Sequence, residues 1–154
     1  MKALTVQQPW AWAIIHGQKD VENRTQAWSY RGPLAIHAGK RISNRGLRTV
    51  PSIVAAERGT SPTLVADQMR VRAATERGAI IGLVDVHHAE ADCCESWWAE
   101  TSYDEHGGRI RRDLTHLVLE DPRPLATPIP CRGALGLWTP PAEVLAQLEE
   151  DTGG

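Results

Sequence analysis

The chain has 154 residues, of which 42% are hydrophobic and 23% charged, and this balance excludes a fibrous or wholly disordered protein. Its 17 basic and 19 acidic residues give a formal net charge of −2, so any nucleic-acid partner must meet a local basic patch rather than a global positive field. Six Trp and no Phe are an unusual aromatic choice. Because Trp combines a large face with a hydrogen-bond donor, some of the six are candidates for stacking on a ligand.

The first forty residues alternate between strand and helix patterns. Residues 10–16 form an apolar run that Pro9 opens and Gly17 closes, and this pattern predicts a short helix. The flanking runs have the length and composition of strands, which we place at residues 3–6, 19–24 and 33–38.

Residues 40–78 are rich in arginine and interrupted by Gly and Pro, and they predict a helical insert. Ser61 followed by Pro62 is a typical helix start, and Gly78 is the expected end. Three arginines share one face if their stretch is helical, and they form either a solvated surface or an electrostatic lip beside a site: Arg41, Arg45 and Arg48.

The second half of the chain begins with a strongly apolar run at residues 79–86, which predicts a central strand. Asp92 is placed to cap a brief helix over residues 92–100. Within that helix, Trp97 and Trp98 are expected to face different directions.

Residues 103–112 are polar and contain two glycines, which predicts a loop of the kind that borders a site. Further strands are expected at residues 116–119 and 134–138, and a C-terminal helix at about residues 140–150. The prolines between the two strands are expected to exclude regular structure there: Pro122, Pro124, Pro128 and Pro130.

Three cysteines, two of them adjacent, make a poor disulfide framework, so we expect reduced thiols. A metal site could be assembled from His87, His88, Cys93, Cys94 and Cys131. However, no Cys-x-x-Cys spacing is present, and neighbouring residues rarely both ligate one tetrahedral ion, so we predict no metal and no other cofactor. No run approaches the ~20 apolar residues of a membrane span and no apolar signal core is seen, so we expect a cytoplasmic protein.

Charges of both signs are concentrated just after the first helix, in the run Gly17-Gln18-Lys19-Asp20-Val21-Glu22-Asn23-Arg24. Side chains alternate along an extended chain, so Glu22 and Arg24 share a face, and Lys19 in the turn can fold back towards it. Such a group could hold a phosphate or a polar base edge. Its members could also neutralise one another as structural ion pairs.

The pattern Gly-x-Lys-x-x-Glu-x-Arg resembles the signature of the ASCH domain, a branch of the PUA-like superfamily of small RNA-associated β-barrels. Flanking segments over about residues 2–140 are similar to the family in order and spacing, namely Gln8-Pro9-Trp10-Ala11, Tyr30-Arg31-Gly32, Leu34-Ala35-Ile36-His37-Ala38-Gly39-Lys40 and Arg132-Gly133-Ala134-Leu135-Gly136-Leu137-Trp138. The chain is also similar to the ASCH module of a transcription coactivator. The resemblance implies an α+β fold in one domain over residues 1–150, a PUA-like β-barrel of about six mixed strands flanked by helices.

The resemblance also implies a cleft between the barrel and the first helix, with the signature at its mouth. On that basis Lys19 is expected to be a phosphate or transition-state cation, Glu22 an acceptor or general base, and Arg24 an anion clamp or an orienter of Glu22. Alternation and the glycine turn predict that these three side chains point into one solvent-reachable cleft, also lined by Trp10 and Tyr30. The apolar positions of the strands should form the core: Val6, Ile36, Ile81, Leu83, Leu119 and Leu137.

Five further residues are candidates for ligand binding. Trp10 starts a helix, where free amide N–H groups can bind an anion, or it is a core aromatic. Tyr30 and Arg31 lie in a turn that would face the cleft and suit base stacking with phosphate contact, although Arg31 could equally be a surface residue. His37 is either a catalytic base or a structural histidine, and Lys40 is an expected phosphate contact.

Two classes of function are open. PUA-like barrels commonly bind RNA, so the resemblance predicts a module that binds RNA, single-stranded nucleic acid or a modified nucleoside. The alternative is a small hydrolase of the family: a ribonuclease in which Glu22 or His37 takes the 2′-hydroxyl proton, or an amidohydrolase on acylated nucleosides. The amidohydrolase branch uses Lys-x-x-Thr, and Glu22 stands at the threonine position. Whether Glu22 is free or held by Arg24 separates binding from catalysis, because a neutralised carboxylate is a poor base.

Overall fold

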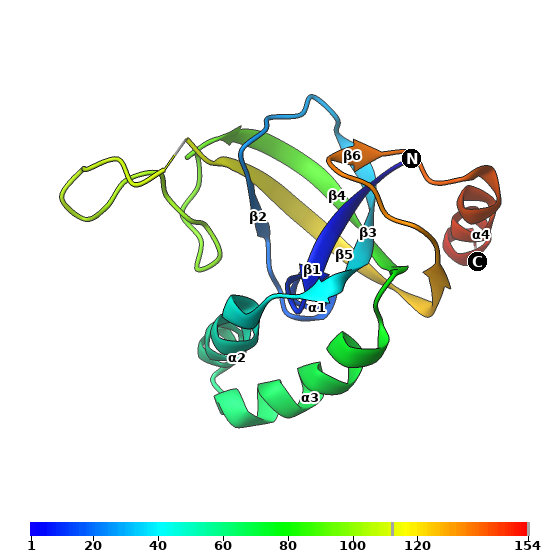
Figure 1. Ribbon diagram of the computed structural model, residues 1–154, viewed down its shortest axis with the longest axis horizontal. Coiled ribbons are helices and arrows are strands. Elements are labelled where there is room, and N and C mark those ends of the chain that lie inside the picture. The colour runs from blue at the N-terminus through cyan, green and yellow to red at the C-terminus, as the bar shows by residue number, and fades with distance from the viewer. Residues whose placement is uncertain (112, 154) are drawn as a thin grey trace.

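The computed structural model describes residues 1–111 and 113–153, and these residues form one curled mixed sheet with helices on both faces (Figure 1). The strands, in chain order, are β1 (Lys2–Gln8), β2 (Val21–Arg24), β3 (Gly32–Ile42), β4 (Ala79–Ala91), β5 (Thr115–Pro130) and β6 (Leu137–Trp138). Their order across the sheet is β2-β5-β4-β3-β1-β6. Only β1 and β3 run parallel, and the other neighbours are antiparallel. The predicted α+β fold with about six mixed strands is confirmed, the sheet being curled as a half-barrel.

The core has a layer on each face of the sheet. On the concave face, the apolar side of α1 (Trp10–His16) packs Ile14 and Ile15 against strand residues that include Val6, Ile36, Ile81 and Leu119. On the other face, α4 (Ala142–Thr152) packs Val144 and Leu148 against a separate group that includes Leu83. The predicted core positions are therefore divided between two layers, with Leu137 partly buried beside the first.

The arginine-rich insert is helical, as the sequence predicts, and it forms α2 (Asn44–Arg58) and α3 (Pro62–Thr75). The second helix ends at Thr75, before the expected end at Gly78. Ser61 caps α3 by accepting a hydrogen bond from the amide of Thr63, with Pro62 in the first turn. Trp12 on the far side of α1 joins a third apolar cluster with α2 and α3. Gln8 connects these elements, because its Oε1 accepts from the Trp12 amide at 2.9 Å while its Nε2 donates to the Glu76 carbonyl at 2.9 Å.

The brief helix expected at residues 92–100 is absent, and this segment is a loop. Asp92 has φ +45° and does not cap a helix; its carboxylate accepts from the amide of Ser102 instead. Side chains of other elements bind the loop backbone, and these tertiary hydrogen bonds outweigh a weak local helix signal. The loop between β4 and β5 projects from one end of the sheet (Figure 1).

The exclusion of regular structure by prolines was wrong, because β5 continues through all four of them to Pro130. Its partner β2 pairs only with residues 115–118, so the rest of β5 is a sheet edge on that side. Proline is tolerated at an edge because no ladder hydrogen bond is required of its nitrogen. Conversely, the strand expected at residues 134–138 is paired only at Leu137 and Trp138.

Two further expectations have definite outcomes. Cys93 and Cys94 are joined by a disulfide, so the prediction of reduced cysteines is wrong for this pair, whereas Cys131 is free. In the part of the chain that the structure describes, no helix has both the length and the apolar character needed to cross a membrane.

Candidate functional site

A cleft of about 440 Å³ opens between α1, β2, α2 and the loop that joins β4 to β5. Its wall contains the signature residues Lys19, Glu22 and Arg24, and also three tryptophans, Trp10, Trp97 and Trp98. The remaining polar lining comes from Asn23 and Thr25, next to the signature residues, and from residues distant in sequence: Arg45, Thr49, Glu100 and Arg111.

Lys19 is the most deeply placed charge, with only 4% of the residue exposed. The chain turns at Gly17 and Gln18, and the amide of Lys19 still donates to the Ala13 carbonyl at 3.0 Å, which directs its side chain back under α1. Its Nζ lies 5.6 Å from the Trp10 ring centroid and 5.7 Å from that of Trp98, within the range of cation–π attraction. Burial lowers the pKa of Lys19, and the charge of Glu22 partly opposes that shift.

Glu22 lies between two cations. Its Oε2 is 3.5 Å from Lys19 Nζ, and its Oε1 accepts from Arg24 Nε at 3.2 Å. Arg24 is itself anchored, because its Nη2 donates to the Thr5 carbonyl on β1 at 3.0 Å. The expected shared face of Glu22 and Arg24 is therefore observed, and the carboxylate is held rather than free.

A second charged group lies opposite, where two arginines meet one carboxylate. Glu100 contacts Arg45 through Oε1, and its Oε2 is 3.0 Å from Arg111 Nη1. Arg45 also stacks over Trp10, with its guanidinium carbon 5.8 Å from the ring centroid. Both arginine side chains are about half exposed, so their unpaired N–H groups can reach a ligand.

Asn23 fixes the loop that carries this second group. Its Nδ2 donates to the Trp98 carbonyl at 2.8 Å, and its Oδ1 accepts from the Glu100 amide at 2.9 Å. Trp98 is bound from the other side as well, because its Nε1 donates to Glu57 on α2 at 3.1 Å. Burial raises the pKa of the Glu57 carboxyl, which the Trp98 hydrogen bond partly offsets. The wall of the cleft is thus tied to both β2 and α2.

The tryptophans differ sharply in exposure. Trp98 is buried at 3%, whereas Trp97 beside it is 66% exposed, so the two face different directions as predicted. Trp97 therefore presents an aromatic face to solvent at the edge of the cleft. Its flat indole face is available for stacking with a planar group.

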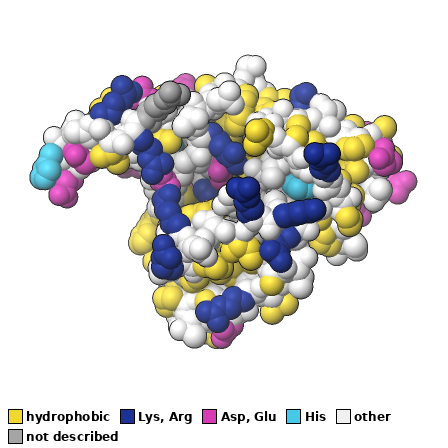
Figure 2. Space-filling model, in the orientation of Figure 1, with side chains coloured by type: hydrophobic (Ala, Val, Ile, Leu, Met, Phe, Trp, Pro, Cys, Tyr) yellow, Lys and Arg dark blue, Asp and Glu magenta, His cyan; other side chains and the backbone are white. Residues whose placement is uncertain are grey.

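The cleft is locally positive although the chain as a whole is acidic. Four cationic side chains line it against two carboxylates, Glu22 and Glu100. Figure 2 shows lysine and arginine side chains gathered across the middle of this face. A local surplus of positive charge is what an anionic ligand needs from a protein with net charge −2.

Two further hollows lie beside the cleft, the second adjoining it and the third adjoining the second. A cavity of about 620 Å³ shares Trp10, Glu22, Asn23 and Arg24 with the cleft and extends to Lys40 and Arg41. A third cavity of about 820 Å³ shares residues 40 and 41 with the second. Arg41 belongs to β3, so it does not share a helix face with Arg45 and Arg48, but it lines both hollows.

Tyr30 and Arg31 do not line any of these three cavities, contrary to the expectation for Tyr30. The Tyr30 hydroxyl donates to the Pro33 carbonyl and accepts from the Lys2 amide, and its ring packs on the core. Arg31 donates to the carbonyls of Trp28 and Tyr30, both at 2.8 Å. Both side chains stabilise the turn before β3.

His37 and Lys40 lie outside the 440 Å³ cleft as well. His37 is 2% exposed at the base of the third cavity, with Nε2 2.9 Å from the Cys131 carbonyl and Nδ1 3.3 Å from Thr5 Oγ1. Burial lowers its pKa, and the contact with Cys131 partly offsets that effect. Lys40 is exposed and lines both the second and the third cavity.

The residues that the sequence did not assign to the site come mainly from the loop between β4 and β5. Trp97, Glu100 and Arg111 carry no motif and reach the cleft only through the tertiary fold. The excess of tryptophan pointed to Trp97, and the polar loop predicted over residues 103–112 pointed to the region of Arg111, but no sequence signal pointed to Glu100. The sequence also predicts that free amide N–H groups at the helix start near Trp10 could bind an anion. The amide of Trp12 is not free for this role, because it donates to Gln8 Oε1.

Comparison with known proteins identifies the class. The ASCH domain family matches residues 4–116, which is most of the chain, so this protein belongs to the ASCH domain family. The crystal structure of ASCH from Zymomonas mobilis is similar to it in fold, with a TM-score of 0.54 and 12% identity over 97% of this chain and 93% of that chain. A point mutant of the same bacterial protein gives a TM-score of 0.53 with 14% identity, over 97% of this chain and 96% of that chain. No curated protein matches the chain.

Proposed function

We propose that this ASCH domain binds single-stranded nucleic acid, with RNA as the expected partner, by stacking a base on Trp97 and holding the adjacent phosphates with arginines. The observation that carries the proposal is an exposed tryptophan and two half-exposed arginines around one cleft of about 440 Å³. That volume is in the range of small-ligand sites and suits one nucleotide. Stacking on an aromatic side chain contributes about 1–3 kcal/mol per base in proteins that bind single strands.

The two arginines are suited to phosphate because their single carboxylate partner neutralises only one of their two positive charges. Arg45 and Arg111 share Glu100, so the group keeps a net positive charge. Guanidinium groups present several N–H donors in a plane and can bind Glu100 and a phosphate oxygen together. Binding through this group should therefore weaken as salt concentration rises.

The adjacency of the cavities, which share lining residues, favours a strand over a single nucleotide. The second cavity meets the cleft at Trp10 and Arg24 and is bordered farther on by Lys40 and Arg41. A strand with one base at Trp97 could pass these cations with its backbone. Positive side chains along a groove, with an aromatic platform at one point, are typical of single-strand binding.

The state of Glu22 supports binding over catalysis. A general base must have an oxygen that can reach a substrate proton, but both oxygens of this carboxylate face cations of the protein itself. Position 22 also lacks the hydroxyl nucleophile of the Lys-x-x-Thr pattern. Glu22 can instead serve as an acceptor that fixes Arg24 and Lys19 at the floor of the cleft.

One observation favours the alternative, a hydrolase of the same family. Burial lowers the pKa of Lys19, and lysines perturbed in this way are common in catalytic sites. A ribonuclease would use Lys19 to stabilise charge on the phosphate, and an amidohydrolase would use it on the acyl group of a modified nucleoside. Turnover therefore has to be measured together with binding.

The test compares wild type, Trp97→Ala and Glu22→Gln for retention of single-stranded RNA, single-stranded DNA and acylated cytidine, and for product formation. Trp97→Ala should weaken nucleic-acid binding by about 1–3 kcal/mol. Tyr103→Ala, which truncates another exposed aromatic outside the cleft, is the matched control and should bind as wild type does. Glu22→Gln should retain binding.

The outcomes separate the two functions. Binding without product in the wild type supports the binding module. Wild-type turnover that is lost in Glu22→Gln supports the hydrolase instead. If neither binding nor product is detected with any of the three ligands, or if Trp97→Ala binds as well as wild type, the proposed mode is wrong.

A further inference from the structure

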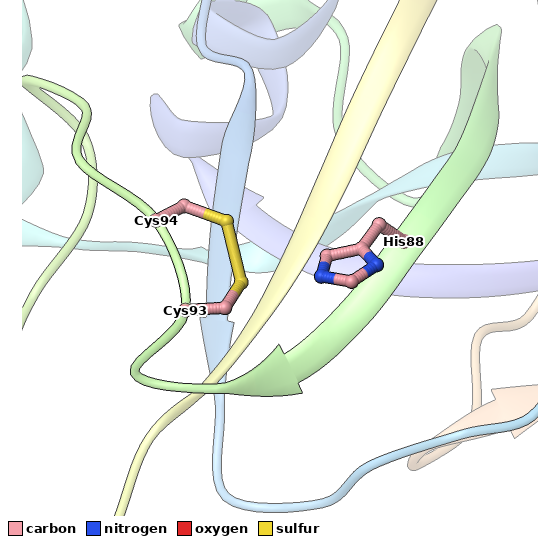
Figure 3. A group of neighbouring side chains, drawn as sticks. All are labelled: His88, Cys93 and Cys94. Atoms are coloured by element: carbon pink, nitrogen blue, oxygen red, sulfur yellow. A yellow bond between two sulfur atoms is a disulfide. The ribbon is translucent and has the colours of Figure 1, made fainter.

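The loop between β4 and β5 begins with a cysteine pair that faces a histidine (Figure 3). His88 lies on β4, and Cys93 and Cys94 follow the end of that strand. One ligand atom from each of the three residues lies within 4.8 Å of the others, and all three residues are half-buried. None of them lines the nucleic-acid cleft, so this cluster is a separate feature of the molecule.

We propose that, when the Cys93–Cys94 disulfide is reduced, the two thiolates and the His88 imidazole form a binding site for a thiophilic divalent metal ion such as Zn²⁺ or Cd²⁺. Thiolate sulfur and imidazole nitrogen are the donors that these ions prefer. Glu90 lies beside the group, with its Oε2 3.5 Å from His88 Nε2, and can supply an oxygen donor or orient the ring. The remaining position would hold water.

The adjacency of the two cysteines argued against metal binding at the level of sequence, because neighbouring residues seldom both turn towards one ion. The fold removes that objection, since both sulfur atoms already lie on the side of the loop that faces His88 (Figure 3). Hydrogen bonds hold the loop backbone in place on both sides. The amide of Asp92 donates to the Leu114 carbonyl at 2.7 Å, and the amide of Cys94 donates to His116 Nδ1 at 3.2 Å.

Formation of the site requires a balanced reduction. A dithiol reductant transfers two electrons and two protons to the disulfide, so the S–S bond breaks, two thiols form, and the reductant closes its own disulfide. Metal binding then displaces the two thiol protons, and two metal–sulfur bonds form. The oxidised protein has no thiolate at Cys93 or Cys94, so it serves as a form of the same chain that lacks the metal site. Affinity for the metal should rise with pH, because the protons compete with it.

The experiment titrates Cd²⁺ into the reduced protein and follows thiolate-to-metal charge-transfer absorption in the ultraviolet. A Cys131→Ser background removes the remaining thiol, which is half-buried near the third cavity. One equivalent of Cd²⁺ should saturate the reduced protein, and the oxidised protein should give no such absorption. Cys94→Ser should abolish tight binding. His88→Gln should weaken it by at least about tenfold, the smaller of the losses seen when partners of metal ligands are removed.

His87→Gln is the matched control, because His87 is the neighbouring residue on β4 but is paired with Glu120 and has a side chain 65% exposed. It should bind Cd²⁺ as the parent does. The proposal is overturned if the reduced protein shows no charge-transfer absorption, if oxidised and reduced protein bind Cd²⁺ equally, or if His88→Gln and His87→Gln behave alike. The comparison of redox states uses one and the same chain in its oxidised and reduced forms, and none of these results depends on the nucleic-acid proposal.

Discussion

Asn23 shows how one side chain can determine a site without contributing charge to it. In an extended strand the side chain of Asn23 alternates away from those of Glu22 and Arg24. In the structure, that alternation is what allows it to bind the backbone at Trp98 and Glu100. The same strand therefore presents charges to the cleft on one face and positions the opposite wall with the other.

Asn23→Ala is expected to lower the free energy of unfolding by about 1–3 kcal/mol, because a half-buried carbonyl and an amide lose their partners. It should also weaken nucleic-acid binding, since Trp97 and Arg111 depend on this loop. Chemical denaturation and fluorescence anisotropy would measure the two effects. Asn44→Ala, at an exposed position on α2, is the control, and equal losses in both variants would contradict the assigned role.

His37 leads to a prediction about acid stability. Burial lowers its pKa in the folded state below the ordinary value near 6.5, so the unfolded chain takes up the proton first as pH falls. The free energy of unfolding contributed by His37 is thus fully present above about pH 7 and declines as pH drops through 6.5 towards the lowered folded pKa. His37→Gln should reduce this decline, while costing about 1–3 kcal/mol at neutral pH through lost packing and hydrogen bonding.

Urea denaturation of wild type and variant at pH 7.5 and pH 5 would check this dependence. His106→Gln is the control, because that side chain is 85% exposed and is solvated whether or not the chain is folded. An identical pH dependence in wild type and His37→Gln would show that His37 does not contribute to it.

Among the elements, α2 forms one wall of the cleft, and Gly46 on it lies in close contact with Pro9 and Trp10 at the start of α1. A Cβ on Gly46 would lie 2.9 Å from Pro9 Cδ and 2.9 Å from Trp10 Nε1. Gly46 is also the residue whose amide is capped by Ser43 at 3.0 Å, so the start of α2 is fixed at this contact. Trp10 and Arg45 meet just beside it.

Gly46→Ala should therefore be destabilising, although alanine is the better helix former by about 1 kcal/mol. The overlap is with a proline ring and an indole, so helix and ring must separate, which costs about 1–3 kcal/mol in packed interiors. Thermal unfolding and nucleic-acid affinity should both decrease. Ser52→Ala, at an exposed position on α2, should leave both unchanged, and a stabilised Gly46→Ala would refute the close-contact argument.

The elements that the sequence predicts well are those fixed by local chemistry. Ser61 and Pro62 define the start of α3, and the apolar run from Ala79 defines β4, because capping and hydrophobic patterning act within a few residues. The proline-rich part of β5 was missed because its tolerance depends on lying at a sheet edge, which is a property of strand order.

The candidate site shows the same difference between residues placed by local chemistry and residues placed by the tertiary fold. Lys19, Glu22 and Arg24 could be placed together from one turn and one strand, since their geometry is local. Trp97, Glu100 and Arg111 could not, because they reach the cleft only when the loop after β4 folds against β2 and α2. The burial of Lys19 was also not predictable, because tryptophans from two distant segments cover it.

At the scale of the whole molecule, the net charge is small but positive side chains are concentrated on one face. The chain carries a net charge of −2, yet one face presents a cleft and two adjoining hollows lined by cations. A protein of this kind should bind nucleic acid weakly except where a strand follows the whole path. Affinity should therefore increase with the length of the strand until the groove is filled.

Lys40→Ala tests that path, because Lys40 is exposed between the second and third cavities and does not line the cleft. The variant should bind a mononucleotide as wild type does and bind a longer single strand more weakly. For the long strand, the slope of log affinity against log salt should be less steep by about 0.7, as expected from the loss of one phosphate contact with a single strand. Arg70→Ala, which removes an exposed charge from α3, should change neither quantity. An equal loss for short and long ligands would place Lys40 in the cleft itself, and no loss for either would mean that the strand does not follow the second cavity.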